Sequence, residues 1–303
     1  SRVGEATGVW RIGMTEALRT MLVRFIEIVA ALARGLNLVA GHDPFHNLIT
    51  AVFVVHIARV HNERVFARRG YRNRWQRWIY RLERWRLLVR CWIGQSPVPP
   101  EPELLSSLEI AYLLYAALLQ DIGCSANAKK TAEMFEANDL YIKQRVAFVK
   151  PNCPISQLRF VLLHAGQAQL SREDRRFFWK RARWFVSRKR RATIKRILRL
   201  RKELAEEAIA LKCHRGGDIV KKLGFPPEVA ETIAQMNECW GGGGYPQGLV
   251  GDQISLSARI LKCARVAASF YTRDGRHDKH AAVTAVKKWA PTVLDPDVVE
   301  SFL

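Results

Sequence analysis

Residues 238–261 read ECWGGGGYPQGLVGDQISLSARIL, a run of four glycines that ends in Tyr245-Pro246 and leads into an apolar helical pattern. Glycine adopts backbone angles that other residues avoid, so a turn of this kind lets the main chain come close to a ligand. It also places an aromatic ring beside that ligand. The stretch therefore marks a candidate ligand-binding loop followed by a helix.

On both sides of this loop, apolar residues recur at helical spacing, as in Ile110-Leu114-Ala117-Leu118, and strand patterns are nearly absent. Helix breakers separate these stretches at Gly41, at the proline-rich run 97–102 and at residues 224–227. Pro227 suits the first turn of a helix because its φ is fixed and it has no N–H. The sequence therefore predicts an all-α protein, with helices over residues 14–34, 45–66, 71–93, 103–121, 155–168, 171–187, 191–213, 215–223, 226–237, 256–270 and 278–289.

The chain is strongly basic, with 49 Lys and Arg residues against 28 Asp and Glu and a formal net charge of +21. Such a balance favours contact with nucleotides, nucleic acid or an anionic membrane. Residues 64–90 interleave arginine with tryptophan and tyrosine, and residues 172–202 hold 15 Lys or Arg and only two acids. These segments either stack on bases or a bilayer surface, or form solvated basic helices whose aromatic rings face the core.

The six cysteines form no CxxC pair, which in a chain of 303 residues indicates reduced core thiols rather than a disulfide framework. The most apolar early stretch, residues 21–40, contains Arg24, Glu27 and Arg34 and is too charged for a membrane span. No signal peptide is visible. We therefore expect a cytoplasmic protein.

Several stretches together resemble the HD-GYP family of metal-dependent phosphohydrolases. Residues 238–261 resemble its signature HHExxDGxGYPxGLxGxxIPxxARI. Residues 115–124 resemble its AALLHDIG segment, and the residues that follow are similar to the branch of the family whose motif is HDIGCTA. Residues 294–302 resemble its FDPxVVxxF, and residues 213–225 loosely resemble its HxxxGxxIxxxLG helix with the glycines shifted. The resemblance implies an HD-domain helical bundle with a C-terminal GYP loop extension over residues 45–303. An N-terminal helical segment (1–44) precedes it, and basic insertions near 64–100 and 171–202 interrupt it.

The family hydrolyses cyclic di-GMP or a related phosphodiester with two or three iron- or manganese-type ions, which activate water and neutralise phosphate charge. Carried over residue by residue, the resemblance implies metal ligands at His46, Asp121 and His214 and catalytic carboxylates at Asp121 and Glu238. It implies nucleotide contacts from Gly244, Tyr245, Pro246 and Arg259.

Most of the family's other metal ligands are replaced in this chain. The HD pair is Gln120-Asp121, the HHE element is Met236-Asn237-Glu238, and Arg265 stands where a late aspartate is expected. A cation at position 265 opposes metal binding by Coulomb repulsion. The resemblance therefore implies one weak Fe or Mn site or none, and no bridged pair of metals. His42-Asp43 also spells HD, but no apolar helix precedes it and no glycine follows, so we do not count it as a motif.

Three functions are consistent with these residues, and whether the chain is an enzyme stays open. The first is a weak or inactive cyclic di-GMP phosphodiesterase. The second is a non-catalytic nucleotide sensor or a scaffold for protein partners, which in this family are often diguanylate cyclases. The third is a polyanion-binding protein that uses its Arg/Trp-rich helices on nucleic acid or an anionic membrane. In the HDIGCTA branch a helix-turn-helix domain often follows the HD-GYP unit, so regulation of transcription is a hint at the level of the family only.

Overall fold

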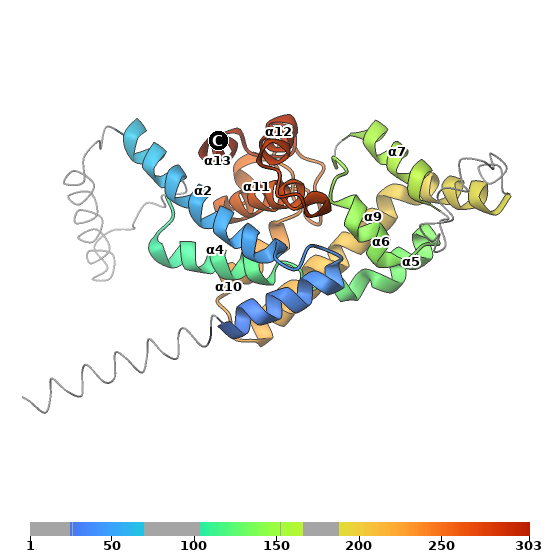
Figure 1. Cartoon of the computed structure of the whole chain (residues 1–303), viewed down its shortest axis with the longest axis horizontal. Coiled ribbons are helices and arrows are strands. Elements are labelled where there is room, and N and C mark those ends of the chain that lie inside the picture. The colour runs from blue at the N-terminus through green and yellow to red at the C-terminus, as the bar shows by residue number, and fades with distance from the viewer. Residues whose placement is uncertain (1–24, 26, 70–103, 152, 166–187) are drawn as a thin grey trace, which may run out of the picture.

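The structure is a computed structural model that describes residues 25, 27–69, 104–151, 153–165 and 188–303 (Figure 1). Within these ranges every regular element is helical, and no strand occurs, which confirms the all-α prediction. A helix over residues 27–40 precedes the other helices in the described part of the chain. The helices are α2 (His46–Arg68), α4 (Ser107–Leu119), α5 (Ala128–Phe135), α6 (Asp139–Val146), α7 (Pro154–His164), α9 (Arg188–Lys222), α10 (Pro227–Gln235), α11 (Leu256–Tyr271), α12 (Lys279–Trp289) and α13 (Pro296–Phe302), with 3-10 turns at Cys124–Asn127, Gly251–Gln253 and Arg273–Gly275.

The main core lies where α2 packs against α4 and α11, with α10, α12 and α13 completing the bundle. Its fully buried side chains include Ile57 of α2, Leu113 of α4 and Leu261 of α11. Residues 107–126 are long and apolar enough to cross a bilayer by composition, and 56% of the apolar 18-residue window within that stretch is buried in the bundle. Packing in the helical core thus accounts for its hydropathy.

Local signals fix where these helices begin. The Ser106 hydroxyl accepts a hydrogen bond from the Glu109 N–H at 3.2 Å, and the Glu109 carboxylate accepts from the Ser106 N–H at 2.7 Å, which forms a capping box at the start of α4. The Ser255 hydroxyl caps α11 by accepting a hydrogen bond from the Ala258 N–H. Pro227 opens α10, as its fixed φ predicts.

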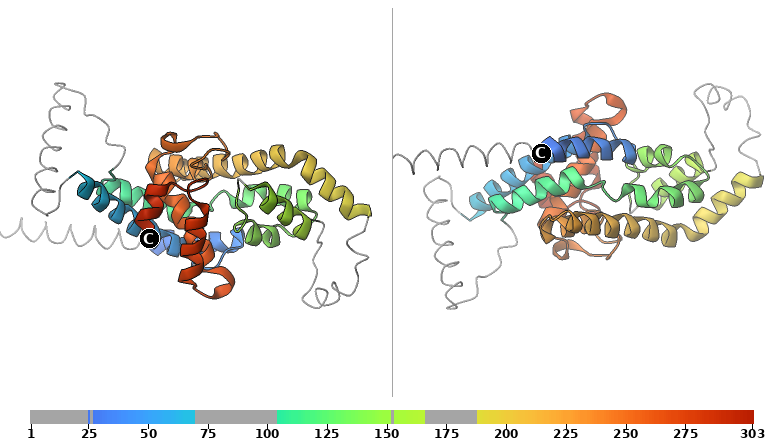
Figure 2. Two further views of the ribbon diagram at one scale, coloured as in Figure 1. Left: turned by 90° about the horizontal axis from the view of Figure 1, so that it is seen from above. Right: turned by 90° about the horizontal axis from the view of Figure 1, so that it is seen from below.

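Helix α9 is a single helix of 35 residues that runs past the core (Figure 2). The helices α5 and α7 pack against its N-terminal part, and α6 packs against α5. They enclose a second apolar cluster that includes Phe135, Ile142, Phe160 and Ile197. The prediction of two helices over 191–213 and 215–223 was therefore wrong, and α5 and α6 were not predicted. The predicted helices over 71–93 and 171–187, and most of the two basic insertions, lie outside the described residues.

The glycine pair Gly216-Gly217 lies within a continuous helix and packs against α10 and the turn after α4. A Cβ at Gly216 would lie 3.2 Å from the Ile233 side chain, so there is little room for one. On the facing turn, a Cβ at Gly123 would lie 2.1 Å from the Lys212 carbonyl oxygen. The turn after α4 and the backbone of α9 are thus in direct contact. This contact sets the positions from which Asp121 and Lys212 extend their side chains.

We expect Gly123→Ala to lower the free energy of unfolding by roughly 1–3 kcal/mol or more, because the added methyl overlaps backbone that cannot move aside cheaply. Gly217→Ala is the matched control, since its Cβ would meet the Ala230 carbonyl oxygen at an ordinary 3.7 Å. Replacing a helical glycine there should instead add up to about 1 kcal/mol. Urea denaturation of both variants checks this; equal effects would contradict the close approach.

Candidate functional site

Asp121 lies at the centre of a cluster of polar side chains where α4 ends. Its carboxylate is completely buried. The Oδ1 atom accepts a hydrogen bond from Lys212 Nζ at 3.1 Å and from the Cys124 thiol at 3.2 Å. The Arg265 guanidinium lies 3.9 Å from the same oxygen. A buried carboxylate thus has two cations beside it, one from α9 and one from α11.

The charges in this cluster favour an ion pair. Burial by itself raises the pKa of Asp121, but the nearby charges, Lys212 first and Arg265 among the others, outweigh it and hold that pKa well below its usual range. Burial and Arg265 likewise oppose the charged form of Lys212, yet Cys124 and Asp121 raise its pKa above the ordinary value. The carboxylate and the ammonium are therefore both charged at neutral pH.

Two histidines face the other side of this carboxylate. The rings of His42 and His46 stack with centroids 4.3 Å apart, and His42 Nε2 lies 3.9 Å from Asp121 Oδ2. Burial lowers the pKa of His42 to about 4 and lowers that of His46 as well, so both imidazoles are neutral at pH 7. Both ring nitrogens of His46 and Asp121 Oδ2 are buried without a hydrogen-bond partner among the described residues. Such atoms are available to a bound ligand or ordered water.

Amides stand at two of the positions where the HD-GYP resemblance implies metal ligands, and both bond within the protein. Gln120 Nε2 donates to Asn47 Oδ1 at 2.9 Å, and Asn47 Nδ2 donates to the Leu118 carbonyl, so α2 is joined to α4. Asn237 Oδ1 accepts from Arg265 Nη1 at 3.1 Å, and its Nδ2 donates to Cys213 Sγ at 3.1 Å. The end of α10 is thus linked to both α9 and α11.

The structure brings together only some of the residues singled out from the sequence. His46 and Asp121 lie in the cluster, whereas His214 lies exposed on α9, away from the buried face that carries Lys212 and Cys213. Sequence reasoning missed Lys212 and His42. A signal for Lys212 was present, because the register Gly216-x-x-Ile219-x-x-x-Leu223-Gly224 matches GxxIxxxLG without a shift and puts position 212 at its leading histidine.

Glu238 holds the glycine-rich loop. Its Oε1 accepts from the N–H groups of Gln247 and Gly248 at 2.7 and 3.2 Å, and its Oε2 accepts from the Leu249 N–H at 3.1 Å. The side chain is buried, and a Cβ at Gly244 would lie 2.4 Å from Glu238 Cα. The carboxylate proposed from the sequence as catalytic is therefore engaged with loop amides in this structure.

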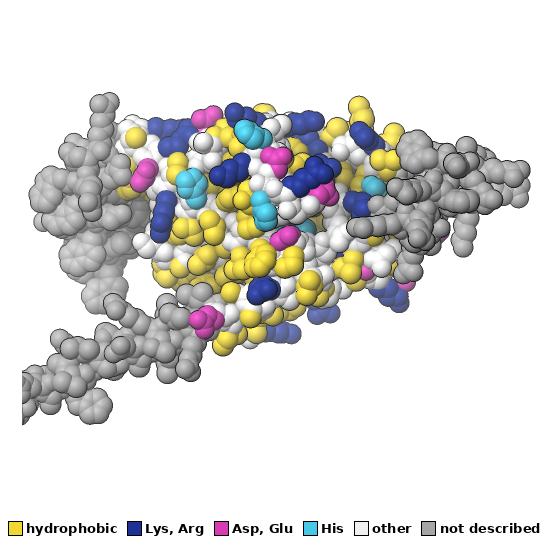
Figure 3. Space-filling model, in the orientation of Figure 1, with side chains coloured by type: hydrophobic (Ala, Val, Ile, Leu, Met, Phe, Trp, Pro, Cys, Tyr) yellow, Lys and Arg dark blue, Asp and Glu magenta, His cyan; other side chains and the backbone are white. Residues whose placement is uncertain are grey.

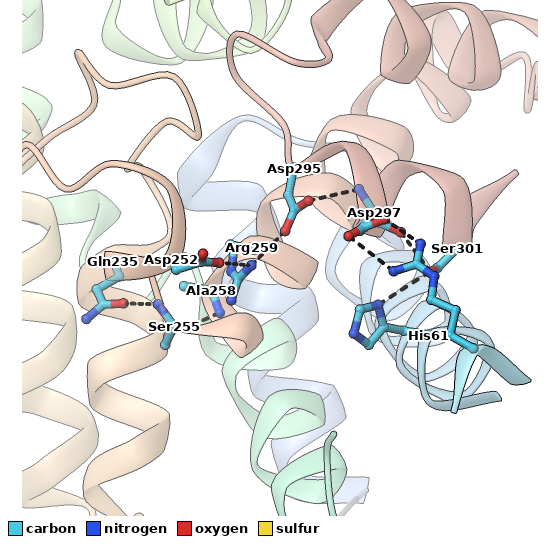
Figure 4. Close-up of polar contacts among 10 residues, drawn as sticks. His61, Gln235, Asp252, Ser255, Ala258, Arg259, Asp295, Asp297 and Ser301 are labelled. Atoms are coloured by element: carbon cyan, nitrogen blue, oxygen red, sulfur yellow. Dashed lines mark hydrogen bonds and ion pairs between the residues drawn. The ribbon is translucent and has the colours of Figure 1, made fainter. Parts of the chain in front are cut away.

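Arg259 joins this loop to the C-terminal helices (Figure 4). Its Nη1 donates to Asp295 Oδ2 at 2.8 Å and to Asp252 Oδ1 at 3.2 Å, and its guanidinium lies 5.3 Å from the centroid of the Trp240 ring. Asp295 in turn caps α13. A small recess lies between the loop and α11, lined by residues that include Arg259, Lys262 and Asp295, and it has room for about one water molecule.

The donor set of the described residues does not fit a two-metal centre. No group of three His, Cys, Asp or Glu side chains within the described ranges is arranged to hold a metal ion. Two cations lie beside Asp121, the Lys212 ammonium at 3.1 Å and the Arg265 guanidinium at 3.9 Å, and both repel a metal ion and donate rather than accept. Besides Asp121, the metal-type donors described in this cluster are the two neutral histidines and the Cys124 thiol.

Comparison with known proteins agrees with this architecture. A family model described as HD domain matches residues 196–298. It is 30% identical over 210 residues to the 3'3'-cGAMP-specific phosphodiesterase 3 of Vibrio cholerae serotype O1, a match that covers 69% of this chain and 41% of the relative.

A crystal structure of a cyclic GMP-AMP specific phosphodiesterase from V. cholerae, V-cGAP3, shares the fold. It superposes with a TM-score of 0.50 at 21% identity and covers 91% of this chain and 47% of that one. The chain therefore spans less than half the length of the relatives it matches.

We expect Glu238→Gln to loosen the glycine-rich loop, because a neutral amide accepts three N–H bonds less strongly than a carboxylate. The free energy of opening the loop should fall by roughly 1–3 kcal/mol, so that the amides of residues 245–250 exchange faster. Hydrogen-exchange mass spectrometry measures it, and Glu63→Gln, at an exposed position of α2, is the control. Unchanged exchange in the loop would show that Glu238 does not hold it.

Proposed function

We propose that this chain is an HD-GYP-type signalling protein that binds a cyclic dinucleotide, or a related phosphodiester, through a cationic site without hydrolysing it. The observation that carries the proposal is the pairing of Lys212 with Asp121, with Arg265 beside them. One carboxylate faces two cations, so the cluster keeps a surplus positive charge that attracts phosphate. The name of the V. cholerae relative and the GYP resemblance both support a cyclic dinucleotide as the ligand.

Binding without turnover follows from what ammonium and guanidinium groups can do. Both neutralise phosphate charge and donate hydrogen bonds to its oxygens. Neither lowers the pKa of a bound water to near neutrality, which is how a metal ion supplies the attacking hydroxide. His42 and His46 are neutral and add polar atoms that a ligand can engage. The site therefore retains recognition and lacks the usual source of the nucleophile.

The polyanion alternative depends on the basic segments, most of which lie outside the described residues. On the face drawn in Figure 3, Lys and Arg side chains alternate with acidic and histidine side chains over the described part of the chain. A continuous basic stripe, which nucleic-acid binding favours, is not seen on that described surface. The Asp121 cluster is thus the better-supported site.

Calorimetric titration with cyclic di-GMP and with 3'3'-cGAMP tests the proposal. We expect one of them to bind with the same affinity in EDTA and in added Mn²⁺, and to remain intact on incubation with Mn²⁺ or Fe²⁺. Turnover that appears with either metal would instead support the residual phosphodiesterase. Binding of any polyanion, with an affinity that falls steeply with salt, would support the third reading.

We expect Arg265→Gln to weaken that binding by roughly 10- to 100-fold, because a charge-assisted hydrogen bond to phosphate is worth about 1.5–3 kcal/mol. Arg215→Gln removes the same charge from an exposed position on α9 and should change the affinity little. The two dissociation constants are measured at one salt concentration. Equal losses would mean that net charge, and not the Asp121 cluster, drives binding.

A further inference from the structure

The surroundings of Lys212 constrain both its side chain and its backbone, which is unusual for a lysine. Its side chain is nearly buried on α9, and its backbone contacts the turn that carries Asp121, since the Lys212 carbonyl leaves no room for a Cβ at Gly123. Its ammonium donates to Asp121 Oδ1 at 3.1 Å. A buried lysine is costly unless its charge is compensated, so this position depends on the carboxylate opposite.

The Lys212 ammonium also belongs to a ring of contacts that joins four elements. Cys213, its neighbour on α9, accepts from Asn237 at the end of α10. Asn237 accepts from Arg265 on α11, and Arg265 lies against Asp121 after α4. Lys212 closes the ring by donating to Asp121. A metal ion joins helices in a comparable way when ligands from several of them meet on it.

The length of a lysine side chain is compatible with its ammonium taking the place of a metal ion. An extended lysine carries its Nζ roughly 6 Å from Cα, as five bonds of about 1.5 Å allow. A histidine at the same position reaches less far, and a metal ion bound to its Nε2 lies about 2 Å beyond that atom. The Lys212 ammonium and a metal ion held by a histidine at that position would thus have a similar reach from the helix backbone. The register of the GxxIxxxLG helix puts that histidine at position 212 in the resembling family.

We propose that Lys212 is a built-in counter-cation that takes the place of a metal ion against Asp121, so that the charged centre of the bundle holds together without metal. Arg265, bonded to Asn237, adds a second fixed cation to the same carboxylate. This inference concerns stability and metal independence. It stands whether or not the cluster binds a nucleotide.

The test compares thermal unfolding of the full chain with three variants, each in EDTA and in added Mn²⁺, alongside metal content by mass spectrometry. The wild type should carry no stoichiometric Mn or Fe, and its unfolding midpoint should be the same in both buffers. Lys212→Met keeps an unbranched side chain and removes the charge. It should lower the midpoint by roughly 10 °C, because an unpaired carboxylate is left buried. Lys221→Met, at an exposed position of the same helix, should change the midpoint by less than about 2 °C.

The double variant Lys212→Met/Asp121→Asn has neither charge and decides the outcome even if the single variant fails to fold. Recovery of most of the lost midpoint in the double variant supports charge neutralisation by Lys212. A double variant as unstable as Lys212→Met would overturn the proposal, as would a wild type that loses stability in EDTA. A Lys212→Met midpoint equal to that of Lys221→Met would also overturn it.

Discussion

The structure depends on how a carboxylate is kept ionised where it has no access to water. Asp121 is completely buried at the end of α4, in a position that would strongly favour the neutral acid if it stood alone. Lys212 and Arg265 reverse this preference, and each comes from a different helix. Because a buried charge with its partner removed is far more costly than the pair, the relative positions of α4, α9 and α11 are fixed by one electrostatic requirement. The contact between Gly123 and the Lys212 backbone serves the same requirement sterically.

The glycine-rich loop is built on separate interactions. Glu238 binds three loop amides, and Arg259 joins Asp252 to Asp295, so the loop is held from its first residue to the helices that follow. None of these contacts requires an ion beyond the side chains themselves. These contacts hold the loop without involving Asp121.

The sequence predicts the helical class and many boundaries well, because apolar spacing and caps are local properties. The helices expected over 45–66, 256–270 and 278–289 are α2, α11 and α12 to within two residues. The break expected in α9 does not occur, since the cost of Gly216 is offset by contacts with Ile233 and the Gly123 turn that no local pattern reveals. Of the candidate site residues, His46 and Asp121 lie in one cluster, whereas His214 is exposed on α9. Lys212 was missed because His214 was aligned with the family's leading histidine, which shifts the register of the helix by two residues.

The positions that differ from the HD-GYP signature also bear on whether those differences arose at random. Random loss of metal ligands leaves buried polar groups without partners, which costs about 1–3 kcal/mol for each one. Here Gln120 bonds to Asn47, Asn237 to Arg265, and Lys212 to Asp121. Among the residues that the structure describes, the buried atoms of this cluster without hydrogen-bond partners are mainly the ring nitrogens of His46 and Asp121 Oδ2, with Gln120 Oε1 beside them. The exchanged residues thus form a network of their own, and the unsatisfied atoms of the retained ones mark where a ligand gains most by binding.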